Sequence, residues 1–167
     1  MTAAMNWELD PEHEEFRASV RAFVDRHVRP VVEESEAAGR PPAALLKEMG
    51  SAGLLGLAVD EADGGGGVDF LAIVVLAEEL ARASGGIAVT ALVTGYMSTP
   101  HIAHFGTAGQ RARYLPGLIS GEKIASIAVT EPGTGSNVGG ITTRATPACP
   151  WASRCARWAG TPPTPAR

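Results

Sequence analysis

Basic residues, cysteines and aromatic residues are all scarce in this chain of 167 residues. The 14 Lys and Arg residues are outnumbered by 18 Asp and Glu residues and form no basic arm or stripe, which argues against a nucleic-acid-binding protein. Cys149 and Cys155 are separated by five residues, which matches neither zinc-ligand nor CxxC redox spacing. We therefore interpret both cysteines as incidental thiols.

Long hydrophobic runs are lacking as well. The uncharged run over residues 83–100 is broken by Gly, Thr, Ser and Pro, so it does not predict a membrane span. Residues 1–10 lack both the positively charged start and the apolar core of a secretory signal. These features predict a cytoplasmic protein without a membrane span.

Apolar residues at helical spacing dominate the first three quarters of the chain and predict a bundle of four or five helices. The first helix is expected to start at Asp10 and Pro11, an N-cap residue followed by proline, to kink at Pro30 and to end at Gly39. The further helices are expected over residues 42–52, 70–83, 87–97 and 108–120.

Three details of these helices can be tested against a structure. Glu78 and Arg82 are spaced for an i, i+4 ion pair, and Pro116 is expected to interrupt the last helix. The small residues between Ala88 and Gly95 allow close approach, either by a neighbouring core element or by a bound apolar chain.

Glycines and histidines offer few chemical sites. The four glycines at 64–67 are not followed by Lys-Ser or Lys-Thr, so they predict a flexible loop rather than a phosphate-binding loop. His27 lies beside an apolar stripe, which favours a packed structural histidine over a catalytic one. His101 and His104 have metal-ligand spacing, but their segment contains no Cys, Asp or Glu, so no metal site is predicted.

Residues 124–146 contain the most informative stretch. Residues 124–129 read as a short strand that breaks at Pro132 and Gly133. The following residues, 134–137, combine unshielded backbone N–H groups with hydroxyls, which suits a phosphate or the polar edge of a ring. A Gly- and Ser-rich hairpin turn without a ligand is the alternative.

A dinucleotide-binding fingerprint does not fit this stretch. Gly133 and Gly135 occupy its first two glycine positions, but Val138 occupies the third. The β-branched residues that follow, up to 146, predict a second strand where the fingerprint requires a helix.

The sequence Ala-Val-Thr-Glu-Pro-x-x-Gly-Ser over residues 128–136 resembles the flavin-binding signature of the acyl-CoA dehydrogenases. Tyr-Leu-Pro at 114–116 and Gly-Glu at 121–122 precede it at the spacing of that family. Asn137 stands where the family usually has Asp, which keeps a polar acceptor and removes a charge.

The resemblance implies a mainly α fold with an N-terminal helical domain over residues 1–122. Residues 123–146 would be the start of the middle β domain, with its first one or two strands. Residues 147–167 depart from the family, because this Pro-, Ala- and Arg-rich tail has no Val, Ile, Leu, Asp, Glu or Lys. We expect either a reading-frame shift near Thr146, giving a truncated chain, or a genuine disordered tail.

The resemblance also assigns FAD as the cofactor and an acyl-CoA thioester as the substrate. Ser136 would contact both the FAD pyrophosphate region and the thioester. The residues assigned to FAD are Ile127, Ala128, Val129, Thr130, Gly135 and Ser136.

The implied activity is α,β-dehydrogenation to the trans-2-enoyl-CoA, with electrons passed to a flavoprotein acceptor in a homo-oligomeric enzyme. Its glutamate base belongs to a C-terminal helical domain without a counterpart here, so no catalytic residue is assigned. Glu12, Glu48, Glu78 and Glu131 are not expected to replace it, and the chain alone is expected to be inactive. The alternative is a non-catalytic helical module that binds an acyl-CoA or a partner helix.

Overall fold

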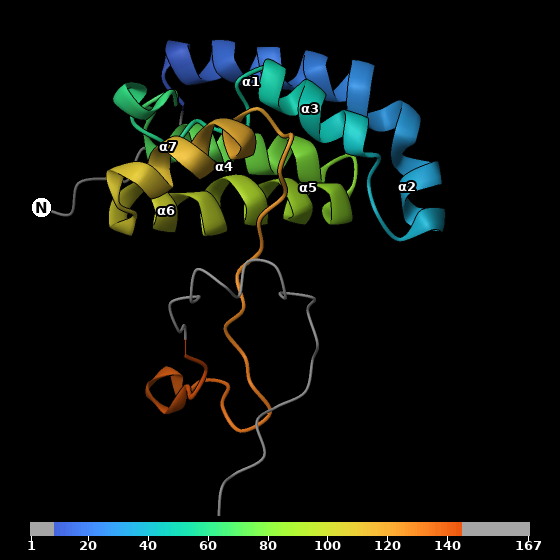
Figure 1. Cartoon of the computed structure of the whole chain (residues 1–167). Coiled ribbons are helices and arrows are strands. Elements are labelled where there is room, and N and C mark those ends of the chain that lie inside the picture. The colour runs from blue at the N-terminus through green and yellow to red at the C-terminus, as the bar shows by residue number, and fades with distance from the viewer. Residues whose placement is uncertain (1–8, 145–167) are drawn as a thin grey trace, which may run out of the picture. The chain divides into compact units, whose positions relative to one another are not determined.

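The computed structural model describes residues 9–144, and the chain divides into two compact units. The first unit runs to Ile127 and the second begins at Ala128. The first unit is helical (Figure 1).

The first helical segment begins and ends where its sequence predicts. The Asp10 side chain accepts a hydrogen bond from the backbone N–H of His13 at 2.9 Å, and Gly39 ends the segment with a φ of 65°. Around Pro30 the helix changes type instead of breaking, because proline removes one backbone donor and crowds the preceding turn. The successive parts are α1 (Pro11–Phe23), the π-helical η1 (Val24–Val28), the 3-10 helix η2 (Arg29–Val31) and α2 (Val32–Ala38).

Four further helical segments lie where the sequence predicts them, whereas the short helix α6 was not predicted. Ser84 and Thr107 cap two of them with their side chains, and Gln110 completes a capping box with Thr107. Because Ser84 accepts from the N–H of Ile87, α5 begins at Gly85 and not at residue 87. The bounds are α3 (Ala43–Ser51), η3 (Glu61–Asp63), α4 (Phe70–Ala81), α5 (Gly85–Leu92), the π-helical η4 (Val93–Ser98), α6 (Thr99–Phe105) and α7 (Ala108–Ile119).

One hydrophobic core joins α1, η1, α3, α4, α5 and the segment 54–57. Helix α1 packs along α4, α4 packs on α5, and α6 packs on α7 (Figure 1). Helices α1, α3, α4 and α5 turn apolar side chains inward, since removing that surface from water is the main favourable term in folding. The buried cluster contains Val20, Val24, Val28, Leu45, Leu46, Met49, Leu54, Leu55, Leu57, Leu76, Leu80, Ile87, Ala88 and Ala91.

The small residues of α5 and η4 pack closely in this core. Ala88 and Ala91 are buried, and a Cβ on Gly95 would lie 2.8 Å from the carbonyl oxygen of Leu55. The structure therefore confirms core packing as their use.

Two local predictions were wrong. Helix α7 continues through Pro116 to Ile119, with Leu115 and Leu118 buried on either side of the proline. Glu78 pairs with Arg17 of α1 at 2.6 Å instead of with Arg82, because the packing of α1 on α4 brings a second cation within reach.

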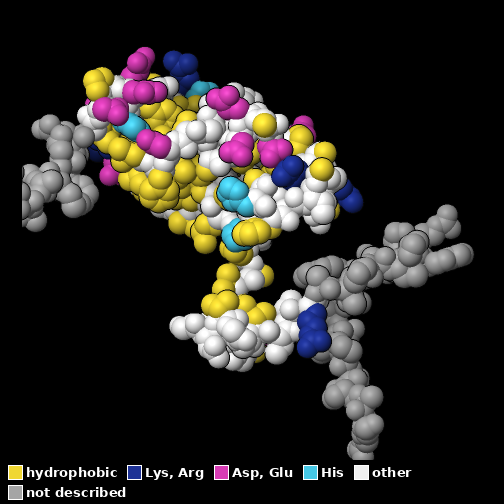
Figure 2. Space-filling model, turned by 90° about the vertical axis from the view of Figure 1, so that its left-hand side faces the viewer, with side chains coloured by type: hydrophobic (Ala, Val, Ile, Leu, Met, Phe, Trp, Pro, Cys, Tyr) yellow, Lys and Arg dark blue, Asp and Glu magenta, His cyan; other side chains and the backbone are white. Residues whose placement is uncertain are grey.

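Some large apolar side chains remain on the surface of the helical unit. Phe70 is 77% exposed and Phe105 is 83% exposed, and Figure 2 shows hydrophobic side chains gathered on one face. Within residues 9–144, no helix combines the length and the hydrophobicity needed to cross a bilayer.

The prediction of strands after residue 123 was wrong. Residues 124–130 have no regular structure, and a short 3-10 helix, η5 (Val138–Gly140), lies where the second strand was expected to start. Among the described residues, the only β-type pairing outside the helices is an isolated bridge between Glu131 and Thr134. A strand needs a neighbour to take up its N–H and C=O groups, and the described residues provide none here.

Candidate functional site

The Pro132-Gly133 turn of the second unit is closed by a pair of backbone hydrogen bonds. The N–H of Glu131 donates to the carbonyl of Thr134, and the N–H of Thr134 donates back to the carbonyl of Glu131, both at 3.0 Å. The Thr134 hydroxyl donates to the carbonyl of Gly140 at 3.0 Å, and this side chain is buried. These bonds hold residues 131 and 134 together and tie residue 134 to residue 140.

The carboxylate of Glu131 braces the same turn by binding residues 142 and 143. It accepts from the N–H of Thr142 at 3.1 Å, from the Thr142 hydroxyl at 2.8 Å and from the N–H of Thr143 at 2.7 Å. The hydroxyl of Thr143, followed by the backbone N–H groups of Thr142 and Thr143, lowers the pKa of Glu131 to about 2. The charged form is therefore the one that holds residues 142 and 143 against the turn.

Replacing Glu131 by Gln is expected to loosen this turn, because the amide accepts at one atom only and carries no charge. The amides of Thr142 and Thr143 should exchange with solvent about tenfold faster, with Glu122→Gln as the exposed control. Since the folded pKa of Glu131 is depressed, its contribution is present above pH 4.5 and is lost as the pH falls towards about 2. Unchanged exchange in Glu131→Gln would show that the carboxylate does not hold the turn.

The predicted flavin residues lie on the exposed side of this braced turn. Thr130, Gly135 and Ser136 are exposed, and a Cβ on Gly135 would meet nothing within 4 Å. Ala128 and Val129 are also exposed and belong to the second unit, whereas Ile127 is the last residue of the helical unit. The second unit thus presents two hydroxyls and an open glycine on a turn that its own bonds hold.

The sequence analysis missed the bracing residues Glu131, Thr134 and Thr142. Their bonds join positions up to 12 residues apart, so no local spacing rule indicates them. A useful signal would have been the acidic residue before Pro-Gly combined with the two consecutive threonines downstream, which together supply several donors.

Two glutamates of the helical unit are engaged in contacts between helices. Glu48 lies 2.8 Å from Nδ1 of His27, whose ring stacks on Phe23 with a centroid distance of 4.7 Å. Glu78 is held by Arg17, as described above. The contacts of His27 agree with the structural role predicted for it.

His101 also uses one ring nitrogen within its own helix. Its Nδ1 lies 2.6 Å from the carbonyl oxygen of Met97, and Phe105 lies beside both His101 and His104. Residues 9–144 contain no group of three or more His, Cys, Asp or Glu side chains placed to hold a metal ion.

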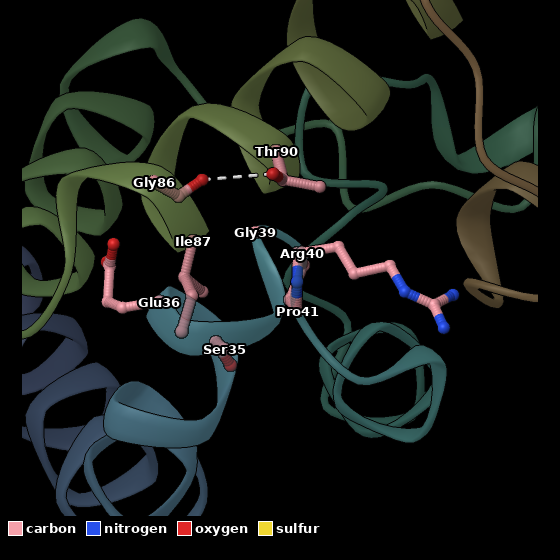
Figure 3. A pocket seen from close by; sticks show the side chains of 8 residues that line it. All are labelled: Ser35, Glu36, Gly39, Arg40, Pro41, Gly86, Ile87 and Thr90. Carbon is pink, nitrogen blue, oxygen red and sulfur yellow. Dashed lines mark hydrogen bonds between the residues drawn. The ribbon is translucent and has the colours of Figure 1, made fainter.

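A hollow of about 130 Å³ opens between α2 and α5 (Figure 3). Its polar groups bond to the chain itself: the Thr90 hydroxyl donates to the carbonyl of Gly86 at 2.9 Å, and Glu36 accepts from Ser84 at 2.7 Å. The Arg40 side chain extends away from the hollow in Figure 3. Of these two bonds, the one from Ser84 to Glu36 joins α2 to the N-cap of α5.

Comparison with known proteins points to one family. A sequence profile described as "Acyl-CoA dehydrogenase, N-terminal domain" matches residues 10–122. An acyl-CoA dehydrogenase of Bacillus subtilis (strain 168) is 35% identical over 129 residues, which cover 77% of this chain and 34% of that protein.

Solved structures similar to this chain point to the same family. The crystal structure of glutaryl-CoA dehydrogenase from Mycobacterium smegmatis is 33% identical, with a TM-score of 0.77 over 86% of this chain and 37% of that chain. The crystal structure of an acyl-CoA dehydrogenase from Bacillus anthracis, complexed with FAD, is 36% identical, with a TM-score of 0.73 over 81% of this chain and 23% of that chain. The chain spans about a third of the length of the curated relatives it matches.

Proposed function

Because the chain belongs to the acyl-CoA dehydrogenase family, we propose that it forms part of an enzyme that dehydrogenates acyl-CoA thioesters with FAD. The helical unit would be its N-terminal domain, and the turn at residues 130–136 would be part of its flavin site. When bound, FAD supplies the acceptor for the hydride that leaves the β-carbon of the thioester. The product would be the trans-2-enoyl-CoA.

The braced turn is the observation that supports a flavin site in this chain. Thr130 and Ser136 offer hydroxyl donors, and exposed Gly135 leaves room for a ligand close to the backbone. Glu131 and Thr134 hold the turn through bonds to Gly140, Thr142 and Thr143, and none of these bonds uses the hydroxyls of Thr130 or Ser136. Donors that are fixed before a ligand binds stabilise developing negative charge without reorganising, which suits a flavin that gains charge on reduction.

In this proposal the chain's own residues position the cofactor and the thioester and do not abstract the proton. The backbone of residues 127–130 and the Thr130 hydroxyl would lie along the flavin ring. Ser136 would donate to the pyrophosphate region and would face the thioester.

The proton acceptor is assigned to a part of the enzyme outside residues 9–144. Glu48 and Glu78 are paired with His27 and Arg17, and the carboxylate of Glu131 is used within its turn. Glu12 lines a hollow formed by α1, the loop at residues 66–69 and the start of α4, all within the helical unit. A flavoprotein electron acceptor and a homo-oligomeric assembly complete the proposal by analogy with the family.

The proposal is tested by assaying the purified chain with FAD, an acyl-CoA and an artificial electron acceptor. We expect FAD binding to be weak and no enoyl-CoA to form. Turnover by this chain alone would overturn the assignment of the base, and saturable acyl-CoA binding without FAD would favour a non-catalytic acyl-CoA-binding module.

Replacing Ser136 by Ala is expected to weaken FAD binding about tenfold or more, because one hydrogen bond to a charged group is lost. Ser51→Ala is the matched control, since Ser51 is also an exposed serine and lies at the end of α3. Titration monitored by flavin fluorescence measures both affinities. Equal affinities in the two variants would exclude Ser136 from the flavin site.

A further inference from the structure

We propose that His13 is a proton-dependent latch that joins the first turns of α1 and α4. Its imidazole lies between the capping carboxylates of both helices. Nδ1 lies 2.8 Å from Oδ1 of Asp10, and Nε2 lies 3.1 Å from Oδ1 of Asp69. The latch therefore connects residues 56 positions apart in the sequence.

In each aspartate, the oxygen that contacts the ring of His13 also accepts a hydrogen bond from a backbone N–H. Oδ1 of Asp10 also accepts from the backbone N–H of His13 at 2.9 Å, and Oδ1 of Asp69 accepts from the N–H of Ala72 at 3.0 Å. These are the N-cap bonds of α1 and α4. A change at His13 therefore acts on two helix starts together.

The protonation state follows from the donor and acceptor roles. An ionised carboxylate only accepts hydrogen bonds, so both ring nitrogens of His13 must donate to satisfy both contacts. A neutral imidazole carries one N–H and would place a lone pair against one of the two carboxylates. Only the imidazolium closes both contacts, and 13% of the His13 side chain is exposed.

The charges around His13 favour the same state. Asp10 and Glu12 belong to the start of α1, and Asp69 caps α4. Arg17, one turn further along α1, is engaged with Glu78 at 2.6 Å and with Glu79 at a longer distance. The hollow of about 350 Å³ beside the latch contains no Lys or Arg among its described lining residues.

The direction of the pKa shifts agrees with this geometry. Hydrogen bonds to Asp69 and then to Asp10 raise the pKa of His13 above 6.5. The bonds from the backbone and ring of His13 lower the pKa of Asp10 below 3.8, and the ring also lowers that of Asp69.

The pH window of the latch follows from these directions. Because the folded pKa of His13 is raised, its contribution is complete below pH 6.5 and is lost as the pH rises through the folded value. Because the carboxylate pKa values are lowered, their contribution is lost as the pH falls below about 3.8. The latch is thus closed in mildly acidic solution and opens on the alkaline side.

The first test is an NMR titration of the histidine ring protons in the full chain. We expect the pKa of His13 to lie above 6.5, and Asp69→Asn to bring it down while keeping a side chain that caps α4. A His13 pKa at or below 6.5 in the unmodified chain would overturn the proposal, and so would a value that Asp69→Asn leaves unchanged.

The second test compares thermal unfolding of His13→Gln with that of the unmodified chain between about pH 5 and 9. Gln keeps a donor for one carboxylate but has no proton to lose, so the variant should lack the alkaline fall in Tm that His13 causes. His101→Gln is the matched control and should follow the unmodified chain, because His101 bonds only to the carbonyl of Met97 among the described residues. Parallel pH profiles for His13→Gln and the unmodified chain would contradict the latch.

Discussion

Replacing Gly50 by alanine is expected to destabilise the helical unit by about 1–3 kcal/mol, the usual effect of forcing extra atoms into a packed contact. A Cβ on Gly50 would lie 2.2 Å from both the carbonyl carbon and the oxygen of Ser120. These are backbone atoms at the end of α7, so no side-chain rotation can make room. The helices would have to separate at this contact, which would expose part of the core around Leu46 and Met49.

A second glycine makes the same contact from the opposite side. Gly121 has a φ of 73°, which favours glycine, and a Cβ there would lie 2.1 Å from the carbonyl oxygen of Leu46. Gly50 and Gly121 together allow the backbone of α3 to touch the turn after α7. Because both backbones are in close contact here, neither α3 nor the turn after α7 can shift freely to make room for an added Cβ.

Gly109→Ala is the control for Gly50→Ala, because Gly109 also lies in a helix but would have nothing within 4 Å of its Cβ. Alanine there should be neutral or stabilising by up to about 1 kcal/mol, from helix propensity alone. Urea unfolding of both variants measures the difference. Similar midpoints for the two would show that the contact between α3 and Ser120 is not tight in solution.

The helices that sequence analysis predicted correctly are those with local signals. Bonds within four residues set the helix ends at Asp10 with Pro11, at Gly39 and at Thr107. The spacing of Leu45 and Met49 marks the buried face of α3. Capping and amphipathic spacing are readable without knowing the fold, because the atoms involved are neighbours in the chain.

The errors arose where tertiary contacts outweigh local preference. Pro116 lacks a backbone donor, yet burial of Leu115 and Leu118 keeps α7 continuous. Glu78 has an i, i+4 partner in Arg82, yet α1 brings Arg17 closer. A local rule cannot weigh these effects, because the competing partner comes from a distant segment.

In the candidate flavin site too, the sequence predicts some features and not others. The motif and the family resemblance assign Thr130, Gly135 and Ser136 to it, and the structure shows that all three residues are exposed. The bonds that shape the turn, from Glu131 to Thr142 and from Thr134 to Gly140, could not be predicted, since hydrogen-bond partners across a loop depend on its path. The predicted strands failed for a related reason, because pairing needs a neighbour that local pattern does not supply.

Replacing Arg21 by alanine is expected to cost about 2–3 kcal/mol, because it leaves a buried carboxylate without its main partner. Arg21 donates from Nε and Nη2 to the two oxygens of Glu79, at 2.9 and 2.7 Å. Only 4% of the Glu79 side chain is exposed, whereas 50% of the Arg21 side chain is exposed. The cost stays below that of a fully buried pair because Nε of Arg17 remains 3.8 Å from Glu79.

The pH dependence of this pair gives an independent check. Hydrogen bonding to Arg21 lowers the pKa of Glu79 below 4.5, so its contribution is present above pH 4.5 and is lost as the pH falls through the folded value. Arg21→Ala should therefore lose less stability on acidification than the unmodified chain does. Chemical unfolding at a series of pH values measures both effects.

Arg29→Ala is the matched control for Arg21→Ala. Arg29 also pairs with a carboxylate, Asp25 at 2.6 Å, but both side chains are more than half exposed. An exposed i, i+4 pair contributes about 0.3–0.5 kcal/mol, so this variant should unfold almost as the unmodified chain does. If Arg21→Ala cost no more than Arg29→Ala, the burial of Glu79 would not be what makes its partner important for stability.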